Sequence, residues 1–139
     1  MKISARNQLK GTIESVKEGA VNGVVTIKLG EDAIKAGITM ESIEELGLEA
    51  GKEAYAIIKA TNVMFATEKI ACISARNQLA GRVTKVVEGA VNGHVSIELP
   101  DGNTVSGSIT NEAIEQLGLT EGSEAVAIIK ATDVIVGVE

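Results

Sequence analysis

The chain contains nearly the same sequence twice, and this repeat limits the possible folds more than any other feature. The offset between the two copies is 70 positions and becomes 71 after one inserted residue near Gly102. The matching segments are residues 3–9 with 73–79, 18–23 with 88–93, and 56–61 with 127–132. The chain is therefore a duplicated module of about 70 residues. We expect two domains, residues 1–68 and 72–139, with a short join around residues 67–71.

Most of each module shows the pattern of β-strands. Apolar side chains largely alternate with polar ones over residues 21–29, as a strand with one buried face requires. Residues 54–60 form a more continuous apolar run, and residues 62–66 form another. Five short strands and one helix per module predict a mainly β fold of two OB-like five-stranded β-barrels. The pattern leaves the order of the strands open.

One short helix is expected in each module. In the first module it covers about residues 40–46, because Thr39 is a suitable N-cap and Gly47 can end the helix in a left-handed conformation. Thr110 and Gly118 occupy the same positions in the second module.

A module of this size buries only about 60% of its unfolded surface and is marginally stable alone. Packing of the two modules, and of whole chains, would add apolar burial. Oligomerisation is therefore expected from size alone.

Composition argues against several classes of protein. With 13 basic and 19 acidic residues the net charge is −6, and Tyr55 and Phe65 are the only aromatic residues. A basic face and stacking side chains for nucleic acid are therefore missing. No apolar segment suits a membrane span or a secretory signal. The single cysteine, Cys72, fits a reducing cytoplasm and is expected to be a small buried side chain.

The candidate site residues are polar side chains that both copies keep. They are Ser4, Arg6, Asn7, Thr39 and Lys59, with Ser74, Arg76, Asn77, Thr110 and Lys130 in the second copy. Residues 71–139 contain only four cations, and two of them are Arg76 and Lys130. Guanidinium, ammonium, hydroxyl and helix N-terminal N–H groups all donate hydrogen bonds, which suits a tetrahedral dianion. Alternatively, Arg6 pairs with a surface carboxylate and Lys59 is simply solvated.

Catalytic patterns are absent. The only histidine, His94, lies on an expected strand, and no zinc-ligand spacing, phosphate loop or nucleophile elbow occurs. The chain is therefore not expected to be an enzyme. The loop at residues 18–23 is either a plain turn or a nest of backbone N–H groups for an anion.

The motifs S-A-R-N-Q-L at 4–9, E-G-A-V-N at 18–22 and I-K-A-T at 58–61 resemble the Mop domain of molbindins. The resemblance covers nearly the whole chain twice, so the chain is similar to a tandem Mop-domain molbindin. It implies a cytoplasmic homotrimer with six Mop domains that binds molybdate or tungstate. It implies no catalysis, no organic cofactor and no direct coordination of a metal by side chains.

The resemblance also implies oxyanion sites between neighbouring domains. One side would contain Ser4, Ala5, Arg6, Lys59 and the backbone of Ala60, and the facing domain would add Thr39 and Ser42. The second copy would use Ser74, Ala75, Arg76, Lys130 and Ala131, with Thr110. Ala113 stands where Ser42 does, and loss of one donor costs about 1 kcal/mol. Two unequal populations of sites are therefore expected.

A second class of site is implied near the threefold axes of the assembly. Its candidate residues are Ala20, Val21 and Asn22, with Ala90, Val91 and Asn92 in the second copy. Several dianions on an acidic protein repel one another, so the affinity should depend on ionic strength.

Three functions follow as alternatives. The first is storage of molybdate or tungstate in the cell, with no nucleic acid or membrane as partner. The second is a regulatory module that senses the oxyanion and acts on a transport or transcription partner. The third is a purely structural oligomer that takes up no anion. The sequence does not decide between molybdate and tungstate.

Overall fold

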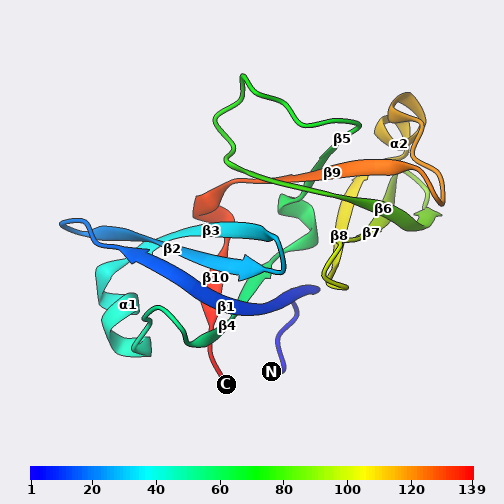
Figure 1. Ribbon diagram of the computed structural model, residues 1–139. Coiled ribbons are helices and arrows are strands. Elements are labelled where there is room, and N and C mark those ends of the chain that lie inside the picture. Colours follow the sequence, from blue (N-terminus) through cyan, green and yellow to red (C-terminus); the bar gives the residue numbers. More distant parts are fainter.

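Ten strands form two five-stranded antiparallel sheets in the computed structural model, which describes residues 1–139 (Figure 1). The first repeat supplies β1 (Asn7–Lys17), β2 (Asn22–Leu29), β3 (Asp32–Thr39), β4 (Glu53–Ile58) and β5 (Met64–Ala66). The second repeat supplies β6 (Asn77–Glu88), β7 (Asn92–Glu98), β8 (Thr104–Thr110), β9 (Glu124–Ile129) and β10 (Ile135–Gly137). The expected mainly β fold with two five-stranded OB-like units is confirmed.

Each repeat contains one short helix, α1 (Met40–Leu46) and α2 (Asn111–Leu117). The Thr39 hydroxyl accepts a hydrogen bond from the backbone N–H of Ser42 at 3.1 Å, which satisfies one of the free donors of the first turn. Gly47 ends α1 with φ 62°, and Gly118 ends α2 with φ 64°. The helices expected from the capping residues are therefore present with the expected ends.

The two sheets exchange their last strands. The strand orders are β10-β4-β1-β2-β3 and β5-β9-β6-β7-β8, so β5 of the first repeat pairs with β9 of the second, and β10 pairs with β4. Figure 1 shows β10 in the lower unit beside β4, and β5 in the upper unit beside β9. The division of the sequence at residues 1–68 and 72–139 and the division of the structure into sheets therefore differ by one strand on each side.

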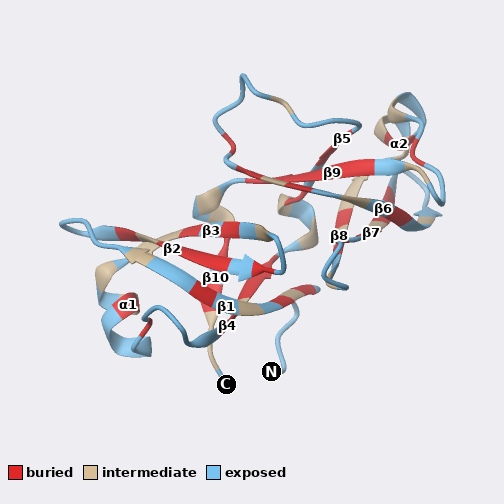
Figure 2. Cartoon of the chain, viewed as in Figure 1, coloured by how far each residue is buried: buried red, intermediate tan, exposed pale blue.

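The exchange joins the two units through one continuous core. Twenty-seven buried side chains from both repeats form a single cluster, and the buried faces of the sheets run through both units in Figure 2. Phe65 of β5 and Val136 of β10 each belong to this cluster although each lies in the sheet of the other repeat. Because neither repeat completes its own sheet, the two fold as one structure.

Two 3₁₀ turns, η1 (Ala60–Asn62) and η2 (Ala131–Asp133), lead from β4 to β5 and from β9 to β10. Each turn carries the chain from one unit to the other. As a result η1 packs on β8 of the second repeat, and η2 packs on β3 of the first.

The residue inserted near Gly102 lengthens the turn between β7 and β8. Gly102 adopts φ 95°, which only glycine tolerates readily. Next to it, the Asn103 side-chain amide donates to the Lys10 carbonyl of β1 at 3.2 Å. The longer turn of the second repeat therefore makes a hydrogen bond to the first unit. The turn between β2 and β3 makes no equivalent hydrogen bond to the second unit.

Two further points concern the surface. Cys72 is exposed, so the expectation of a buried cysteine is wrong: the join that contains it runs outside both sheets. None of the helices is both long and apolar enough to cross a lipid bilayer.

Candidate functional site

The candidate hydroxyls of the first repeat lie together where β3 ends and α1 begins. The Thr39 hydroxyl donates to the Ser42 hydroxyl oxygen at 2.9 Å, while it accepts from the Ser42 backbone N–H. Because the Thr39 hydrogen is already used, the free hydroxyl hydrogen at this end of the strand belongs to Ser42. Thr39 is exposed and Ser42 is half-buried, so this hydrogen can reach a ligand.

The second repeat has the same backbone geometry with one hydroxyl fewer. The Thr110 oxygen accepts from the Ala113 backbone N–H at 3.1 Å, as Thr39 does from Ser42. Since Ala113 has no hydroxyl, the Thr110 hydrogen itself is free. Each repeat therefore presents one free hydroxyl hydrogen at its helix start, but from a different atom.

Ala131 and Thr132, which follow Lys130 in the second repeat, lie against the strand of the first repeat that ends at Thr39. At Gly37, two residues before Thr39, an added methyl group would lie 4.0 Å from the Ala131 carbonyl oxygen and 3.7 Å from the Thr132 methyl. These are ordinary van der Waals distances, so η2 packs directly on this part of β3. This contact of η2 with β3 therefore brings together residues that are about 90 positions apart in sequence.

The equivalent contact, between η1 and β8, joins the remaining candidate residues of the two repeats. Lys59 and Ala60 lead into η1, which packs on β8, the strand that ends at Thr110. Within one chain, the segment that follows Lys59 therefore packs on the strand of Thr110 rather than on that of Thr39. The resemblance alone had placed Thr39 and Ser42 opposite Lys59.

The four repeated cations are free of ion pairs. The only salt bridge in the chain joins Lys10 and Glu53 at 3.5 Å, and Lys59 and Lys130 are both exposed. Arg6 and Arg76 are exposed too, so the alternative in which Arg6 pairs with a carboxylate is wrong. These cations remain available for an anion.

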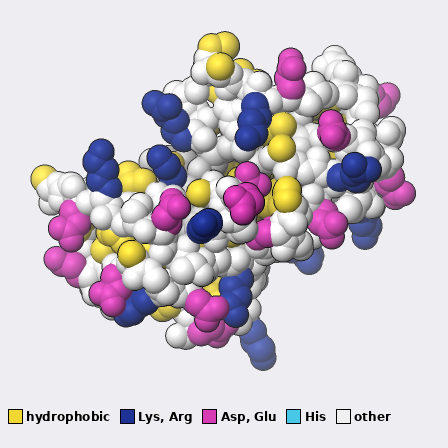
Figure 3. Space-filling view, viewed as in Figure 1, with side chains coloured by type: hydrophobic (Ala, Val, Ile, Leu, Met, Phe, Trp, Pro, Cys, Tyr) yellow, Lys and Arg dark blue, Asp and Glu magenta, His cyan; other side chains and the backbone are white.

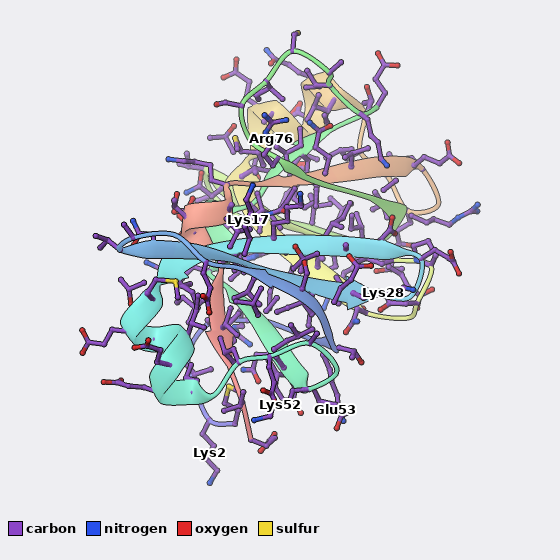
Figure 4. All side chains as sticks on the ribbon, turned by 60° about the vertical axis from the view of Figure 1, so that its left-hand side comes forward. Lys2, Lys17, Lys28, Lys52, Glu53 and Arg76 are labelled. Atoms are coloured by element: carbon purple, nitrogen blue, oxygen red, sulfur yellow. The ribbon has the colours of Figure 1, made fainter.

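Arg76 is not gathered with the hydroxyls of the first repeat inside one chain. Figure 4 shows Arg76 beside the join at the top of the molecule, well separated from α1. In the segments that lead into β1 and β6, Ser4 and Ser74 are exposed, whereas Ala5 and Ala75 are buried. One chain therefore supplies parts of the candidate site on separate surfaces.

Asn7 and Asn77 hold the units together and do not serve as ligand donors. The Asn7 amide donates to the carbonyls of Ile58 at 3.1 Å and Ser106 at 2.8 Å, and its oxygen accepts from the Ser106 N–H. Asn77 makes the same pair of bonds with the backbone of Lys35. Both are nearly inaccessible, so their place among the candidate site residues is a misassignment.

The loops of the proposed second class of site lie next to the hydroxyls. Asn22 pairs with Thr39, and Asn92 pairs with Thr110. The side chains of Val21 and Val91 are 70% and 71% exposed. Ala20 and Ala90 are also exposed.

One sequence signal of the contact between the units was overlooked. Gly107 of β8 has no room for a methyl group, because Phe65 and Val63 lie against it, and a glycine inside a strand pattern is a common sign of such a close approach. The roles of Asn7 and Asn77 had no comparable signal, since a repeated asparagine fits a ligand site equally well.

The TOBE domain matches this chain twice, at residues 3–65 and 73–136. The molybdenum transport protein ModE of Azotobacter vinelandii is 42% identical over 139 residues, which are 99% of this chain and 52% of that protein. The molybdenum-pterin-binding protein MopA of Rhodobacter capsulatus is 38% identical over 137 residues, 97% of this chain and 52% of that protein. The chain thus spans about half the length of these curated relatives.

Among solved structures, the cytoplasmic molybdate-binding protein ModG with molybdate bound superimposes with a TM-score of 0.94. It is 46% identical to this chain, and the match covers 100% of both chains. At this level of identity the two chains share their fold in detail.

Proposed function

Because the chain belongs to the TOBE-domain family through both of its repeats, we propose that it binds molybdate or tungstate and stores it in the cytoplasm. The ModG relative, which is a cytoplasmic molybdate-binding protein, matches this chain over its full length. That likeness supports both the ligand and the cellular location.

The observation that carries the proposal is a set of donors without internal partners. Arg6, Lys59, Arg76 and Lys130 make no ion pairs, and one hydroxyl hydrogen is free at each helix start. The oxygens of molybdate and tungstate accept hydrogen bonds and donate none, so they suit a surface that only donates. The proposed residues are those given above for the sites between neighbouring domains. The loops at residues 20–22 and 90–92 are proposed as the second class of site.

We further propose that the site is completed by other copies of the chain in a homotrimer. Arg76 lies apart from α1 within one chain (Figure 4), which supports a site in which another copy brings its arginine to the hydroxyls of α1. Exposed apolar side chains occur in pairs at equivalent positions of the two repeats and support such an assembly. They are Ile3 with Ile73, Val21 with Val91, and Met64 with Ile135.

Binding alone is the proposed activity, without catalysis, an organic cofactor or nucleic acid. The charge distribution supports the last point: on the face in Figure 3, Lys and Arg side chains occur together with Asp and Glu side chains. The net charge of −6 also disfavours binding to the negatively charged backbone of a nucleic acid.

The alternative function is that of a regulatory module for a transport or transcription partner. The ModE relative is a molybdenum transport protein, and this chain matches only 52% of it. Oxyanion binding by the matching half would then control what the remainder does. A stoichiometric protein partner recovered with the chain would favour this alternative over storage.

Equilibrium dialysis tests the proposal. The protein is dialysed against molybdate, tungstate and sulfate, and bound metal is counted by elemental analysis while sedimentation equilibrium gives the assembly state. We expect a trimer that takes up molybdenum and tungsten and little sulfate. A monomer, or a protein that takes up neither metal, would contradict the proposal.

A pair of double variants locates the sites. Replacing Arg6 and Arg76 by alanine should abolish the interdomain sites and leave the trimer intact. The matched control replaces Arg82 and Lys85, two exposed cations on β6, and removes the same charge. If both double variants lose binding equally, net charge rather than the proposed site would explain uptake.

A further inference from the structure

The two loops proposed as the second class of site present free backbone donors. In each loop two successive N–H groups make no hydrogen bond within the chain, and the residues that carry them are exposed. These residues are Ala20, Val21, Ala90 and Val91. Successive free N–H groups in a turn can bind an anion. The geometry of both loops therefore suits a nest better than a plain turn.

The loop of the second repeat is closed by a hydrogen bond that the first repeat lacks. The Gly89 N–H donates to the Asn92 carbonyl at 2.9 Å, whereas the Gly19 N–H makes no such bond. The strand pairing also continues for one residue pair more in the second repeat, to Glu88 and Gly93. The second loop is therefore the more tightly constrained of the two.

Asn111, the first residue of α2, adds a side-chain bond to this loop. Its amide nitrogen donates to the Gly89 carbonyl at 2.8 Å. The amide oxygen has no hydrogen-bond partner, so the bond to Gly89 is the only one that the side chain makes. Both backbone polar groups of Gly89 are thus paired, directly before the free N–H groups of the loop.

The bond to Gly89 fixes the direction of a free donor. The Gly89 carbonyl and the Ala90 N–H belong to one planar peptide unit and point in opposite directions. At the other end of the loop the backbone N–H of Asn111 donates to the Val91 carbonyl at 2.8 Å. The peptide unit between these two bonds, which carries the Val91 N–H, is therefore held from both sides.

The first repeat has only half of this arrangement. Met40 takes the place of Asn111, and its backbone N–H donates to the Val21 carbonyl at 2.8 Å. A thioether donates no hydrogen bond, and the Gly19 carbonyl has no partner within the chain. No bond therefore fixes the direction of the Ala20 N–H.

We propose that Asn111 is a positioning residue that makes the 88–93 loop the tighter of the two oxyanion loops. The inference rests on the proposed binding of molybdate or tungstate by these loops. A loop that is already ordered loses less conformational entropy when its ligand binds. The 18–23 loop offers the same donors but has to order one more peptide unit. One hydrogen bond corresponds to about a fivefold difference in affinity.

Reciprocal exchange of the two residues tests the proposal on the full chain. Asn111→Met gives the second repeat the side chain of the first, and Met40→Asn does the reverse. Both side chains fit, because Met40 Sδ beside Gly23 and Asn111 Oδ1 beside Gly93 occupy equivalent places. Gln116→Met, which removes another exposed amide from α2, is the matched control.

Molybdate is titrated into each protein, and NMR follows the amide signals of Val21 and Val91 separately. In the wild type Val91 should reach half of its shift at an about fivefold lower molybdate concentration than Val21. Asn111→Met should remove the difference by weakening the response of Val91. Met40→Asn should remove it by strengthening that of Val21, a gain that general destabilisation does not produce. Gln116→Met should change neither response.

Equal midpoints in the wild type, or an unchanged Val91 midpoint in Asn111→Met, would overturn the proposal. Shifts confined to the Ser42 and Ala113 amides, at the two helix starts, would also overturn it and would leave the proposed function intact. If no amide signal responds to molybdate, the proposed function fails and the inference fails with it.

Hydrogen exchange of the protein without molybdate gives a second readout. The Gly89 amide is hydrogen-bonded and the Gly19 amide is not, so Gly89 should exchange at least about tenfold more slowly. Asn111→Met should remove most of this protection. Equal exchange of the two glycines in the wild type would overturn the proposal whether or not the chain binds molybdate.

Discussion

The side chain of Asn7 forms a two-way hydrogen-bond pair with the backbone of Ser106, 99 residues away. The amide nitrogen donates to the Ser106 carbonyl at 2.8 Å, and the Ser106 N–H donates to the amide oxygen at 2.7 Å. Ser106 lies on β8, an edge strand of the second sheet. The carboxamide therefore takes the place of a peptide unit and covers an open edge.

Replacing Asn7 by alanine should destabilise the whole chain. The change removes three hydrogen bonds and leaves polar groups unpaired at a nearly inaccessible position. We expect a loss of about 2–4 kcal/mol in the free energy of unfolding, measured by urea denaturation. Gln8→Ala on the same strand is the control and should cost less than about 1 kcal/mol. Equal effects of the two changes would contradict the role given to Asn7.

The exchange of β5 depends on a glycine in β8. A methyl group at Gly107 would overlap the Phe65 ring and lie 3.1 Å from Val63 Cβ, and both side chains are buried. Gly107→Ala should therefore destabilise the protein by about 1–3 kcal/mol. At Gly37 the nearest atom would be 3.7 Å away, so Gly37→Ala should leave the unfolding midpoint unchanged or slightly higher. Thermal unfolding of the two variants gives the comparison.

The two populations of sites between domains should have the same affinity for molybdate once both contain the same pair of hydroxyls. This prediction rests on the proposed binding of molybdate. Ala113→Ser would restore beside Thr110 the pair of hydroxyls that Thr39 and Ser42 form at 2.9 Å. Each repeat has one free hydroxyl hydrogen, but it lies on Ser42 in the first repeat and on Thr110 in the second, and a displaced donor changes the affinity by about 1 kcal/mol, or about fivefold. Calorimetric titration of the wild type should need two affinities and that of Ala113→Ser only one. A uniform affinity already in the wild type would refute the expectation.

The only tyrosine, Tyr55, should lose its proton at a higher pH than an exposed tyrosine does. The pKa of Tyr55 is raised above its ordinary value, first by a hydrogen bond to the Glu139 carboxylate and then by desolvation and by the charge of Glu139. A raised pKa means that this contribution to stability is complete below the pKa of the unfolded state, about 10, and is lost as the pH rises through the folded-state pKa.

Absorbance at alkaline pH measures this directly, because no other tyrosine or tryptophan is present. Glu139→Gln should bring the midpoint of tyrosine ionisation down towards that of an exposed tyrosine. Glu53→Gln, which alters a weaker influence on the same side chain, should move it less. No difference between Glu139→Gln and the wild type would exclude the Tyr55–Glu139 hydrogen bond.

Local rules were sufficient for the elements of this fold. Thr39 and Gly47 define the two ends of α1 through backbone bonds within a few residues, so the sequence predicted both ends correctly. Burial of every second residue of β2 follows from the two-residue period of a strand in the same way, and Thr26 is the one residue of the other face that is also buried. The duplication, the number of strands and the oxyanion-suited donor set all follow from residues that are close in sequence or repeated in it.

Only the tertiary structure decided which strand completes which sheet and which polar residues remain free. Met64–Ala66 and Ile135–Gly137 are equivalent in the repeat, and either could pair with β4 or β9 by pattern alone. The choice depends on contacts between distant segments, such as Phe65 against Gly107 and η2 against Gly37. Packing likewise turned Asn7 into an edge cap and left Arg6 unpaired, since hydrogen-bond partners 99 residues apart are set by the fold and leave no local mark in the sequence.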